Sequence, residues 1–240
     1  MLEEEKEEEI EWWEYGPSVT AYDLVGNNFF TRFARSALYI AIRFYFRFYH
    51  QLKVTGNIPD LEGKSYIIVS NHSSHLDTPL IFSCFPLKYV NRIRALAAKD
   101  YFFSNPLVRI LTHLLCNLIP ISRKSADFTS ISMCNKMLKK GNNVVIYPEG
   151  TRTRNGIMGE FKPGVGIFLK KECPSVLPVY IEGTYKAMNY KMKYPHQQLV
   201  EITFGNPIVF NGESISKMSN EEIAEKIQKE VVKLSKEGDV

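Results

Sequence analysis

From Lys53 onward the chain alternates short apolar runs with longer amphipathic segments, and this alternation limits the fold more than any other feature. The runs that resemble strands are 65–70, 92–97, 117–121, 143–147, 176–181 and 199–209. The segments with helical spacing are 77–85, 105–115, 125–140, 163–171 and 219–236. Strands that alternate with helices favour a largely parallel sheet covered on both faces. The sequence therefore predicts one α/β domain over 53–240, with a mostly parallel, mixed central sheet flanked by helices.

The charge of the chain is unevenly distributed. Residues 1–11 hold seven Glu and one Lys, a net charge of −6, so the remaining residues must carry +10 to give +4 overall. Segment 1–23 is therefore expected to be an acidic N-terminal segment that is flexible at its start. A basic body suits an anionic partner, such as a nucleic acid, a phosphorylated metabolite or an anionic lipid surface.

The cysteines and the N-terminus bear on the compartment. The four cysteines form no C-x-x-C pair and lie far apart in the chain: Cys84, Cys116, Cys134 and Cys173. We expect them to be reduced thiols in a protein that faces the cytosol. The N-terminus is acidic where a secretory signal peptide needs positive charge, so no signal peptide is predicted.

Segment 24–52 contains no acidic residue and is rich in aromatic residues. On a helix, its arginines share one face roughly 120° wide; they are Arg32, Arg35, Arg43 and Arg47. Aromatic residues that include Phe33, Phe44 and Phe48 fill the opposite side. This pattern is typical of an amphipathic helix in a membrane interface, and the charges interrupt it too often for a transmembrane span. The alternatives are a helix that packs on the core with a solvated face and a helix that binds a partner protein.

The strand candidate at 65–70 ends in the polar cluster NHSSHLD. His72 and Asp77 are five residues apart and would lie on different faces of one helix. They meet if His72 occupies a turn and Asp77 the first helical turn, and the S-x-x-D spacing of Ser74 and Asp77 predicts a helix start near Ser74. A histidine held by a carboxylate is the general-base half of a catalytic triad. The alternative is that Ser74 and Asp77 cap a helix and His72 merely completes a turn.

His75 offers a second metal ligand beside His72. No third ligand has suitable spacing, so no metal site is predicted.

A second polar loop follows the strand candidate at 143–147, in the stretch NVVIYPEGTRTRNG. It supplies Glu149, Gly150, Thr151 and Arg152, and the next helix candidate is preceded by Lys162. A third strand candidate is followed by Arg123. Ligands of α/β sheets gather at the carboxyl ends of strands, and arginine suits phosphate oxygens. Although each cation could be a solvated surface charge, their repetition at strand ends favours a shared anion site.

Together these residues resemble the glycerolipid acyltransferases, in particular the 1-acylglycerol-3-phosphate acyltransferase type. NHSSHLD is similar to the family's N-H-x-x-x-x-D block, and YPEGTRTRNG is similar to its E-G-T-R block. IPISR resembles a further block, with Ser122 where aspartate is usual, and VLPVYIEGT resembles the last, with Pro178. The four blocks occur in the family's order between Asn71 and Thr184.

The resemblance implies transfer of a fatty acyl group from a thioester to the free hydroxyl of 1-acylglycerol-3-phosphate, giving phosphatidic acid. In this scheme His72 is the general base, Asp77 orients it, and Glu149 orients either the acceptor glycerol or Arg152. The implied acceptor and phosphate site comprises Arg123, Glu149, Gly150, Thr151, Arg152 and Lys162. The implied supporting residues are Asn71, Ser73 and Pro178. No cofactor is expected, since acyl-coenzyme A or an acyl-carrier protein would serve as co-substrate.

Several alternatives remain at this point. The acceptor could instead be glycerol-3-phosphate or another lysophospholipid. A thioesterase or lipase would use Ser73 or Ser74 as nucleophile, although the chain contains no G-x-S-x-G elbow. A non-enzymatic phosphate or nucleic-acid binder would explain the basic body and leave the His72–Asp77 pair unexplained. We expect an anionic lipid membrane as partner, with no nucleic acid, and a peripheral or monotopic location on the cytoplasmic face of that membrane.

Overall fold

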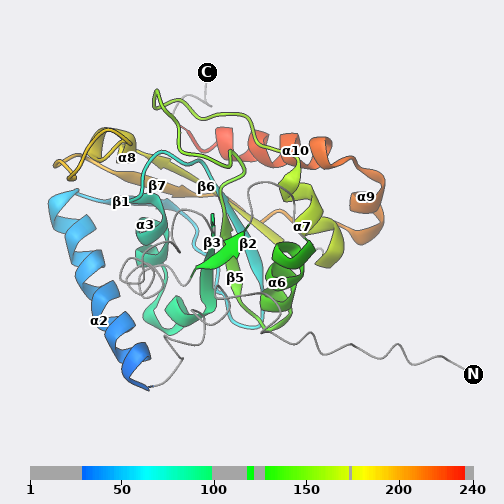
Figure 1. Ribbon diagram of the computed structural model, residues 1–240, viewed down its shortest axis with the longest axis horizontal. Coiled ribbons are helices and arrows are strands. Elements are labelled where there is room, and N and C mark those ends of the chain that lie inside the picture. The colour runs from blue at the N-terminus through cyan, green and yellow to red at the C-terminus, as the bar shows by residue number, and fades with distance from the viewer. Residues whose placement is uncertain (1–28, 99–117, 122–127, 173–174, 236–240) are drawn as a thin grey trace, which may run out of the picture.

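The computed structural model describes residues 29–98, 118–121, 128–172 and 175–235. Its centre is a seven-stranded sheet in the order β1-β7-β6-β2-β5-β3-β4 (Figure 1). The strands are β1 Lys53–Gly56, β2 Tyr66–Ser70, β3 Ile93–Ala98, β4 Ile119–Ile121, β5 Asn143–Ile146, β6 Ser175–Glu182 and β7 Glu201–Phe204. All neighbours are parallel except β6 and β7. The prediction of a mostly parallel, mixed sheet is therefore confirmed.

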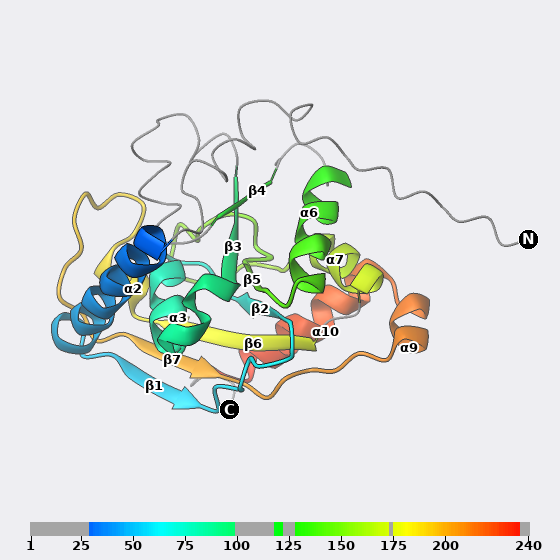
Figure 2. The ribbon, with the colours of Figure 1, turned by 90° about the horizontal axis from the view of Figure 1, so that it is seen from below.

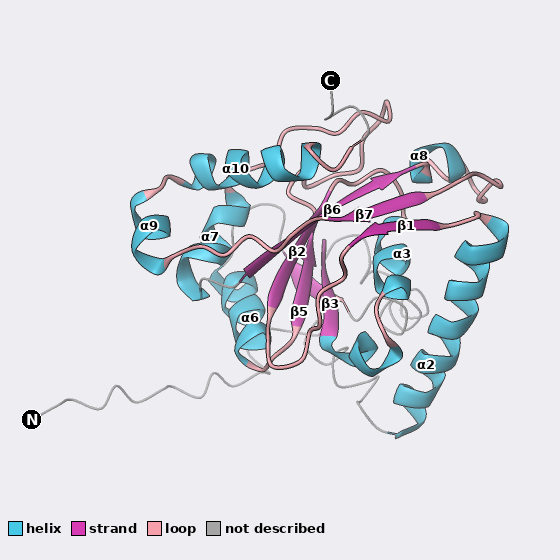
Figure 3. Ribbon diagram, turned by 180° about the vertical axis from the view of Figure 1, so that it is seen from behind, coloured by secondary structure: helices cyan, strands magenta, loops and turns pink. Residues whose placement is uncertain are grey.

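Helices cover both faces of the sheet. They are α2 Phe29–Phe44, which continues as η2 Tyr45–Tyr49, α3 Asp77–Cys84, η3 Leu87–Arg92, α6 Phe128–Lys139, α7 Gly164–Glu172, α8 Thr184–Ala187, α9 Gly212–Lys217 and α10 Asn220–Val232. Figures 1 and 3 show the sheet between α6, α7 and α10 on one side and α2 and α3 on the other. Figure 2 shows α2 beside α3.

The alternation of side chains along β2 explains the two-sided core. Ile67 and Val69 pack in the cluster on the side of α6 and α10, whereas Ile68 packs in the cluster that contains Tyr39 of α2 and Leu80 of α3. Successive residues of a strand point to opposite faces, so a strand between two helical layers must be apolar throughout. All five residues of β2 are buried, and this central strand ends at the candidate site.

The predicted elements agree with the structure except at the sheet edge and in the short helices. β7 ends at Phe204 although the sequence predicted a strand to 209, because Gly205 and Pro207 follow and proline has no N–H for the ladder. The edge strand β1 and the short helices α8 and α9 were not predicted. The helix candidate 105–115, the acidic segment 1–23 and Arg123 lie outside the described residues.

Helix α2 turns two of its arginines toward the protein. Arg35 is buried and donates from Nη1 to Asn91 Oδ1 at 2.7 Å. Arg43 donates from Nε to Ser83 O at 2.8 Å and from Nη2 to Phe85 O at 2.6 Å. The prediction that Arg35 faces a membrane is therefore wrong, because its side chain is buried against Asn91. Arg43 remains exposed, and its guanidinium binds carbonyls at the end of α3 that lack helical partners.

The other positions of α2 remain exposed. Arg32 is exposed, and Arg47 donates from Nη1 to Leu52 O at 3.4 Å while remaining largely accessible. Phe33, Phe44 and Phe48 are exposed by 67%, 59% and 70%. The outer face of this helix is thus mainly aromatic. Within the described ranges, no helix is both long enough and apolar enough to cross a bilayer.

Candidate active site

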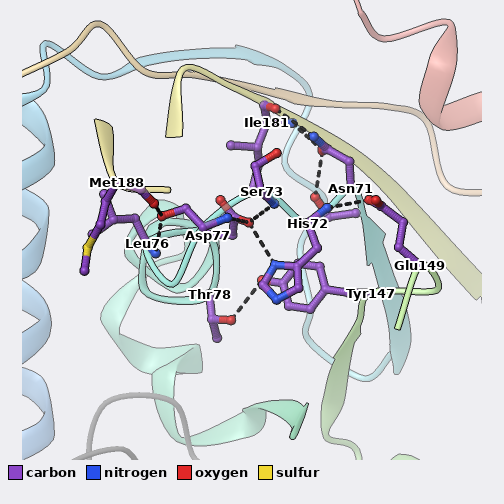
Figure 4. A network of polar contacts seen from close by, with 12 residues as sticks. Asn71, His72, Ser73, Leu76, Asp77, Thr78, Tyr147, Glu149, Ile181 and Met188 are labelled. Atoms are coloured by element: carbon purple, nitrogen blue, oxygen red, sulfur yellow. Dashed lines mark hydrogen bonds and ion pairs between the residues drawn. The ribbon is translucent and has the colours of Figure 1, made fainter. Parts of the chain in front are cut away.

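The turn that carries His72 starts from an asparagine at the end of β2. The Asn71 side chain continues the pairing with β6, since Nδ2 donates to Ile181 O and Oδ1 accepts from Ile181 N, both at 2.8 Å. A side-chain amide offers the same donor and acceptor as a peptide group. The main chain can therefore leave the sheet at Asn71, which puts His72 in the turn (Figure 4).

One oxygen of Asp77 holds both the imidazole and the turn. Asp77 Oδ2 lies 2.9 Å from His72 Nδ1 and accepts from Ser73 N at 2.7 Å and from Ser74 N at 2.8 Å. Asp77 is fully buried and is the first residue of α3, where the helix dipole favours a negative charge. The contact that the spacing predicts between His72 and Asp77 is thus present in the structure.

The start of α3 agrees with the helix candidate 77–85 and differs from the start near Ser74 that the capping spacing predicts. The helix begins at Asp77, three residues after Ser74. Ser74 Oγ accepts from Leu76 N at 3.1 Å and donates to Met188 O at 2.6 Å. These bonds use the serine hydroxyl to hold a turn and to attach the segment after β6, so that residues 74–76 precede the helix.

The imidazole of His72 has one nitrogen bound and one nitrogen available. Its ring stacks on Tyr147, with ring centres 4.0 Å apart and planes 14° apart, and the Tyr147 hydroxyl lies 2.9 Å from Thr78 Oγ1 (Figure 4). A carboxylate only accepts hydrogen bonds, so Nδ1 carries the proton and Nε2 carries the lone pair. No described residue hydrogen-bonds Nε2, and 19% of the side chain is accessible. Nε2 is therefore placed to accept a proton from a bound molecule.

Glu149 binds the main chain instead of a neighbouring cation. Its Oε1 accepts from His72 N at 2.7 Å and its Oε2 accepts from Gly159 N at 2.9 Å. Burial raises the pKa of Glu149, while these two hydrogen bonds oppose the shift. The sequence analysis predicts the acceptor glycerol or Arg152 as the partner of this residue. In the structure each carboxylate oxygen holds a backbone donor, and the predicted contact stays a prediction.

The register of two neighbouring strands explains why Glu149 reaches His72. Val69 of β2 pairs with Ile146 of β5. His72 and Glu149 each follow their paired residue by three positions, so the loops after β2 and β5 leave the sheet together. The carbonyl of His72 also accepts from Thr153 N at 2.9 Å. The main chain of His72 is thus bonded on both sides to the second loop.

The second loop brings the predicted cations near this turn. Gly150 has φ of +72°, and a Cβ added there would lie 2.9 Å from Lys162 Nζ. Thr151 is exposed and Arg152 is half-buried. Neither Arg152 nor Lys162 has an acidic partner within the part of the chain that the structure describes. The loop therefore presents unneutralised positive charge beside His72.

His75 is held in its neutral form. Burial is the main cause that lowers the pKa of His75 from 6.5 to about 4, and the charges of Arg152 and His72 act in the same direction. In the described ranges, no three His, Cys, Asp or Glu side chains are grouped so as to hold a metal ion.

A comparison with protein families accounts for the arrangement of the two loops. The model of the family described as Acyltransferase matches residues 51–182, which include both loops and all of the strands from β1 to β6. The chain belongs to the acyltransferase family. The resemblance of the four sequence blocks to acyltransferases is thereby confirmed at the level of the family.

Curated relatives of this acyltransferase chain match it over part of their length. A chloroplastic 1-acyl-sn-glycerol-3-phosphate acyltransferase of Arabidopsis thaliana is 27% identical over 144 residues, covering 58% of this chain and 38% of the relative. Tafazzin of Drosophila melanogaster is 29% identical over 159 residues, covering 62% of this chain and 42% of tafazzin. The chain thus spans less than half the length of either relative.

A solved structure has the same fold as this acyltransferase chain. The crystal structure of the 1-acyl-sn-glycerophosphate acyltransferase of Thermotoga maritima has a TM-score of 0.63 and 22% identity. The match covers 89% of this chain and 85% of that chain. The mixed sheet with its flanking helices is therefore shared with an acyltransferase fold.

The serine residues of the acyltransferase turn are poorly placed for a nucleophile. Ser74 is fully buried and donates its hydroxyl proton to Met188 O. Ser73 contributes its backbone N–H to Asp77, and no hydrogen bond joins its hydroxyl to His72. Pro178 lies inside β6, opposite Val69, and so supports the sheet at a distance from the imidazole.

Two contacts of His72 and one contact of Glu149 were not predicted. Tyr147 stacks on the imidazole, Thr153 N binds the main-chain carbonyl of His72, and Gly159 N donates to Glu149. The β2–β5 register could have indicated Tyr147, because it directly follows the residue that pairs with Val69. No sequence signal marks Gly159, whose backbone contact depends on how the loop after β5 folds back.

Proposed function

We propose that the chain transfers a fatty acyl group from an acyl thioester to the free hydroxyl of 1-acylglycerol-3-phosphate, which gives phosphatidic acid. The observation that carries the proposal is the His72–Asp77 contact with Nε2 accessible, next to a loop with unneutralised Arg152 and Lys162. Family membership supports the transfer of an acyl group. The similarity to the 1-acyl-sn-glycerol-3-phosphate acyltransferase of Arabidopsis thaliana supports this acceptor.

The proposed reaction is direct attack assisted by a general base. His72 Nε2 removes the proton of the acceptor hydroxyl as its oxygen bonds to the thioester carbonyl carbon. The carbon–sulfur bond then breaks, and the departing thiolate takes the proton from the imidazolium. Asp77 stabilises the positive charge that His72 carries in between. A positioned base of this kind contributes typically ~10²–10⁴ in rate.

The acceptor phosphate binds the cations of the second loop. Arg152 offers a planar pair of donors that matches two phosphate oxygens, and Lys162 adds a second positive charge. Arg123 joins them in this proposal. Gly150 and Thr151 form the loop wall, where Gly150 leaves space for the Lys162 ammonium. Glu149 acts by holding the main chain of His72 in place.

The aromatic face of α2 seats the enzyme on a membrane, in a peripheral position on the cytoplasmic face. The support is the exposure of Phe33, Phe44 and Phe48 along one side of the helix. Replacing these three residues by glutamine should reduce flotation with lipid vesicles. The same replacement of exposed Ile157 and Val209, which lie elsewhere, should leave flotation unchanged. Equal binding by both variants would contradict this role for α2.

The experiment that tests the reaction is release of free thiol from palmitoyl-coenzyme A. Wild type and His72→Ala are compared with no acceptor, with lysophosphatidate, with glycerol-3-phosphate and with other lysophospholipids. Release that depends on lysophosphatidate and disappears in His72→Ala supports the proposal. A parallel assay with an acyl-carrier-protein thioester identifies the donor. A thermal melt of each variant verifies that it is folded.

Other outcomes of the same assay overturn the proposal. Release without any acceptor would indicate a thioesterase, and no release with either donor would exclude catalysis of this transfer. Thiol release that depends on a different lysophospholipid would show that this lipid, and not lysophosphatidate, is the acceptor. The similarity to tafazzin, whose name is not that of a 1-acylglycerol-3-phosphate acyltransferase, is the reason for including several lysophospholipids.

A further inference from the structure

Residues 184–200 form a basic, tyrosine-rich segment that the acyltransferase family match does not include. The segment joins β6 to β7 and reads TYKAMNYKMKYPHQQLV, with three lysines, three tyrosines and no acidic residue. The family match ends at residue 182. We call residues 184–200 the Tyr–Lys loop.

The Tyr–Lys loop exposes its aromatic rings and its charges together. Tyr190 and Tyr194 are exposed by 44% and 67%. The ammonium groups of Lys191 and Lys193 lie 5.7 Å and 5.5 Å from the centres of these two rings. Lys186 is also exposed. None of the three lysines has an acidic partner in the described ranges, so the loop has a net positive surface.

The loop packs against the end of the aromatic helix. The Tyr49 hydroxyl donates to Pro195 O at 3.4 Å, and His50 Nδ1 lies 3.1 Å from Gln198 O. Figures 1 and 3 show the loop beside the C-terminal end of α2. Phe44 and Phe48, whose rings stack 5.8 Å apart, are exposed at this end. Basic and aromatic side chains of two distant segments are thus brought together.

The loop is also bonded to the turn of the candidate base. Ser74 Oγ donates to Met188 O at 2.6 Å, and Ser74 N donates to the carboxylate that holds His72. A molecule bound to the Tyr–Lys loop therefore lies next to the segment that carries the base.

We propose that the Tyr–Lys loop is a binding surface for the anionic headgroups of a lipid membrane. Tyrosine and lysine both place an apolar body at the membrane boundary and a polar tip among headgroups. Unpaired lysines near an anionic membrane surface are attracted to it. The loop would add to the positive charge of exposed Arg32 and Arg47, since Arg35 and Arg43 of the same helical segment bond within the protein. This proposal rests on the proposed function in one respect: the lipid substrate is the reason for the protein to bind a membrane.

The test is vesicle flotation of the full chain with a charge-matched control. One variant carries Lys186→Gln, Lys191→Gln and Lys193→Gln. The control variant carries Lys64→Gln, Lys170→Gln and Lys217→Gln, which remove the same charge from exposed lysines on other parts of the surface. Vesicles of phosphatidylcholine alone are compared with vesicles that also contain phosphatidylglycerol. Thermal melts verify that both variants are folded.

The proposal predicts a selective loss of binding to the anionic vesicles. Each lysine near such a surface contributes about fivefold in affinity, so the loop variant should bind roughly a hundredfold more weakly. The control variant should bind as the wild type does. Equal weakening of both variants would show a net-charge effect and overturn the proposal. Unchanged vesicle binding with weaker binding of soluble acyl-coenzyme A would assign the lysines to the donor instead.

Flotation does not depend on turnover, so failure of the two proposals can be distinguished. Wild-type protein that binds anionic vesicles through the loop but transfers no acyl group would refute the proposed reaction alone. Protein that transfers acyl groups while the loop variant floats like the wild type would refute the loop proposal alone.

Discussion

Replacing Asp77 by asparagine keeps the shape of the side chain and removes its charge. Asp77 Oδ2 accepts from Ser73 N, from Ser74 N and from the His72 imidazole, whereas Oδ1 is buried with no partner among the described residues. The asparagine oxygen can take the place of Oδ2 and keep the three bonds. Its NH₂ group must then occupy the place of Oδ1. A buried donor without an acceptor costs about 1–3 kcal/mol, so we expect this loss in the free energy of unfolding.

The effect on catalysis follows from the charge of the imidazole in the proposed reaction. A hydrogen bond that involves an ionised group is stronger than a neutral one by about 1–2 kcal/mol. In the variant, the imidazolium of His72 loses this additional stabilisation from a charged hydrogen bond, which lowers kcat by about tenfold. If the amide turns its NH₂ group toward His72, Nδ1 must become the acceptor. The wrong nitrogen then carries the proton, and the loss approaches the ~10²–10⁴ of an entire general base.

The assay is acceptor-dependent thiol release by wild type and Asp77→Asn at saturating substrate, together with urea denaturation of both. Asp60→Asn is the matched control, because Asp60 accepts from the Tyr89 hydroxyl and from Glu62 N on an exposed segment. The control should keep the wild-type kcat. An Asp77→Asn variant that is folded and has a kcat within about twofold of wild type would refute the reasoning from charge stabilisation.

Three further outcomes are expected. Glu149→Gln leaves one of its two backbone donors without a carboxylate oxygen, so the free energy of unfolding should fall by about 1–3 kcal/mol, measured by urea denaturation. Because burial lowers the pKa of His75 to about 4, the stability that its neutral form contributes is complete above pH 6.5 and is lost as the pH falls through about 4. Denaturation of the wild type across this range should show a fall in the free energy of unfolding of at most about 3 kcal/mol, and this fall should be absent in His75→Gln. A variant with the same pH dependence as the wild type would contradict this expectation. Gly183→Ala should destabilise more than Gly141→Ala in thermal melts, since both have positive φ but the new Cβ at Gly183 also overlaps the Leu199 carbonyl oxygen; equal melting temperatures would be contrary to this expectation.

The central strands and the main helices could be predicted because one signal dominates each of them. β2 and β5 are continuous apolar runs, as a strand covered on both faces must be. The helix candidate 219–236 has helical spacing, and α10 begins there with a capping box of Ser219 and Glu222. The edge strand β1 gives no such signal. Its residues are mostly exposed, so neither a continuous apolar run nor strict alternation marks it.

The contact of His72 with Asp77 was predictable because it is local, whereas the role of Glu149 was not. Two residues five apart can be tested against the geometry of one turn. The bonds from Glu149 join backbone groups 77 and 10 residues away, and they depend on strand register and on the path of a loop. Similarly, the sequence predicts that α2 has a basic face and an aromatic face, but it does not predict which face packs against the rest of the protein. That orientation depends on the carbonyl ends of α3, to which Arg43 binds.

The number of residues between His72 and Asp77 is set by the hydrogen bonds that close this turn. One carboxylate oxygen meets the imidazole at one end of the turn and two successive main-chain amides inside it. An inserted or deleted residue would carry at least one of these donors out of reach. The amides at Ser73 and Ser74 are donors that every residue except proline supplies. The length of this turn is therefore fixed, whereas the side chains at its inner positions can vary. A comparison of sequences would then show mainly the histidine and the aspartate at its two ends.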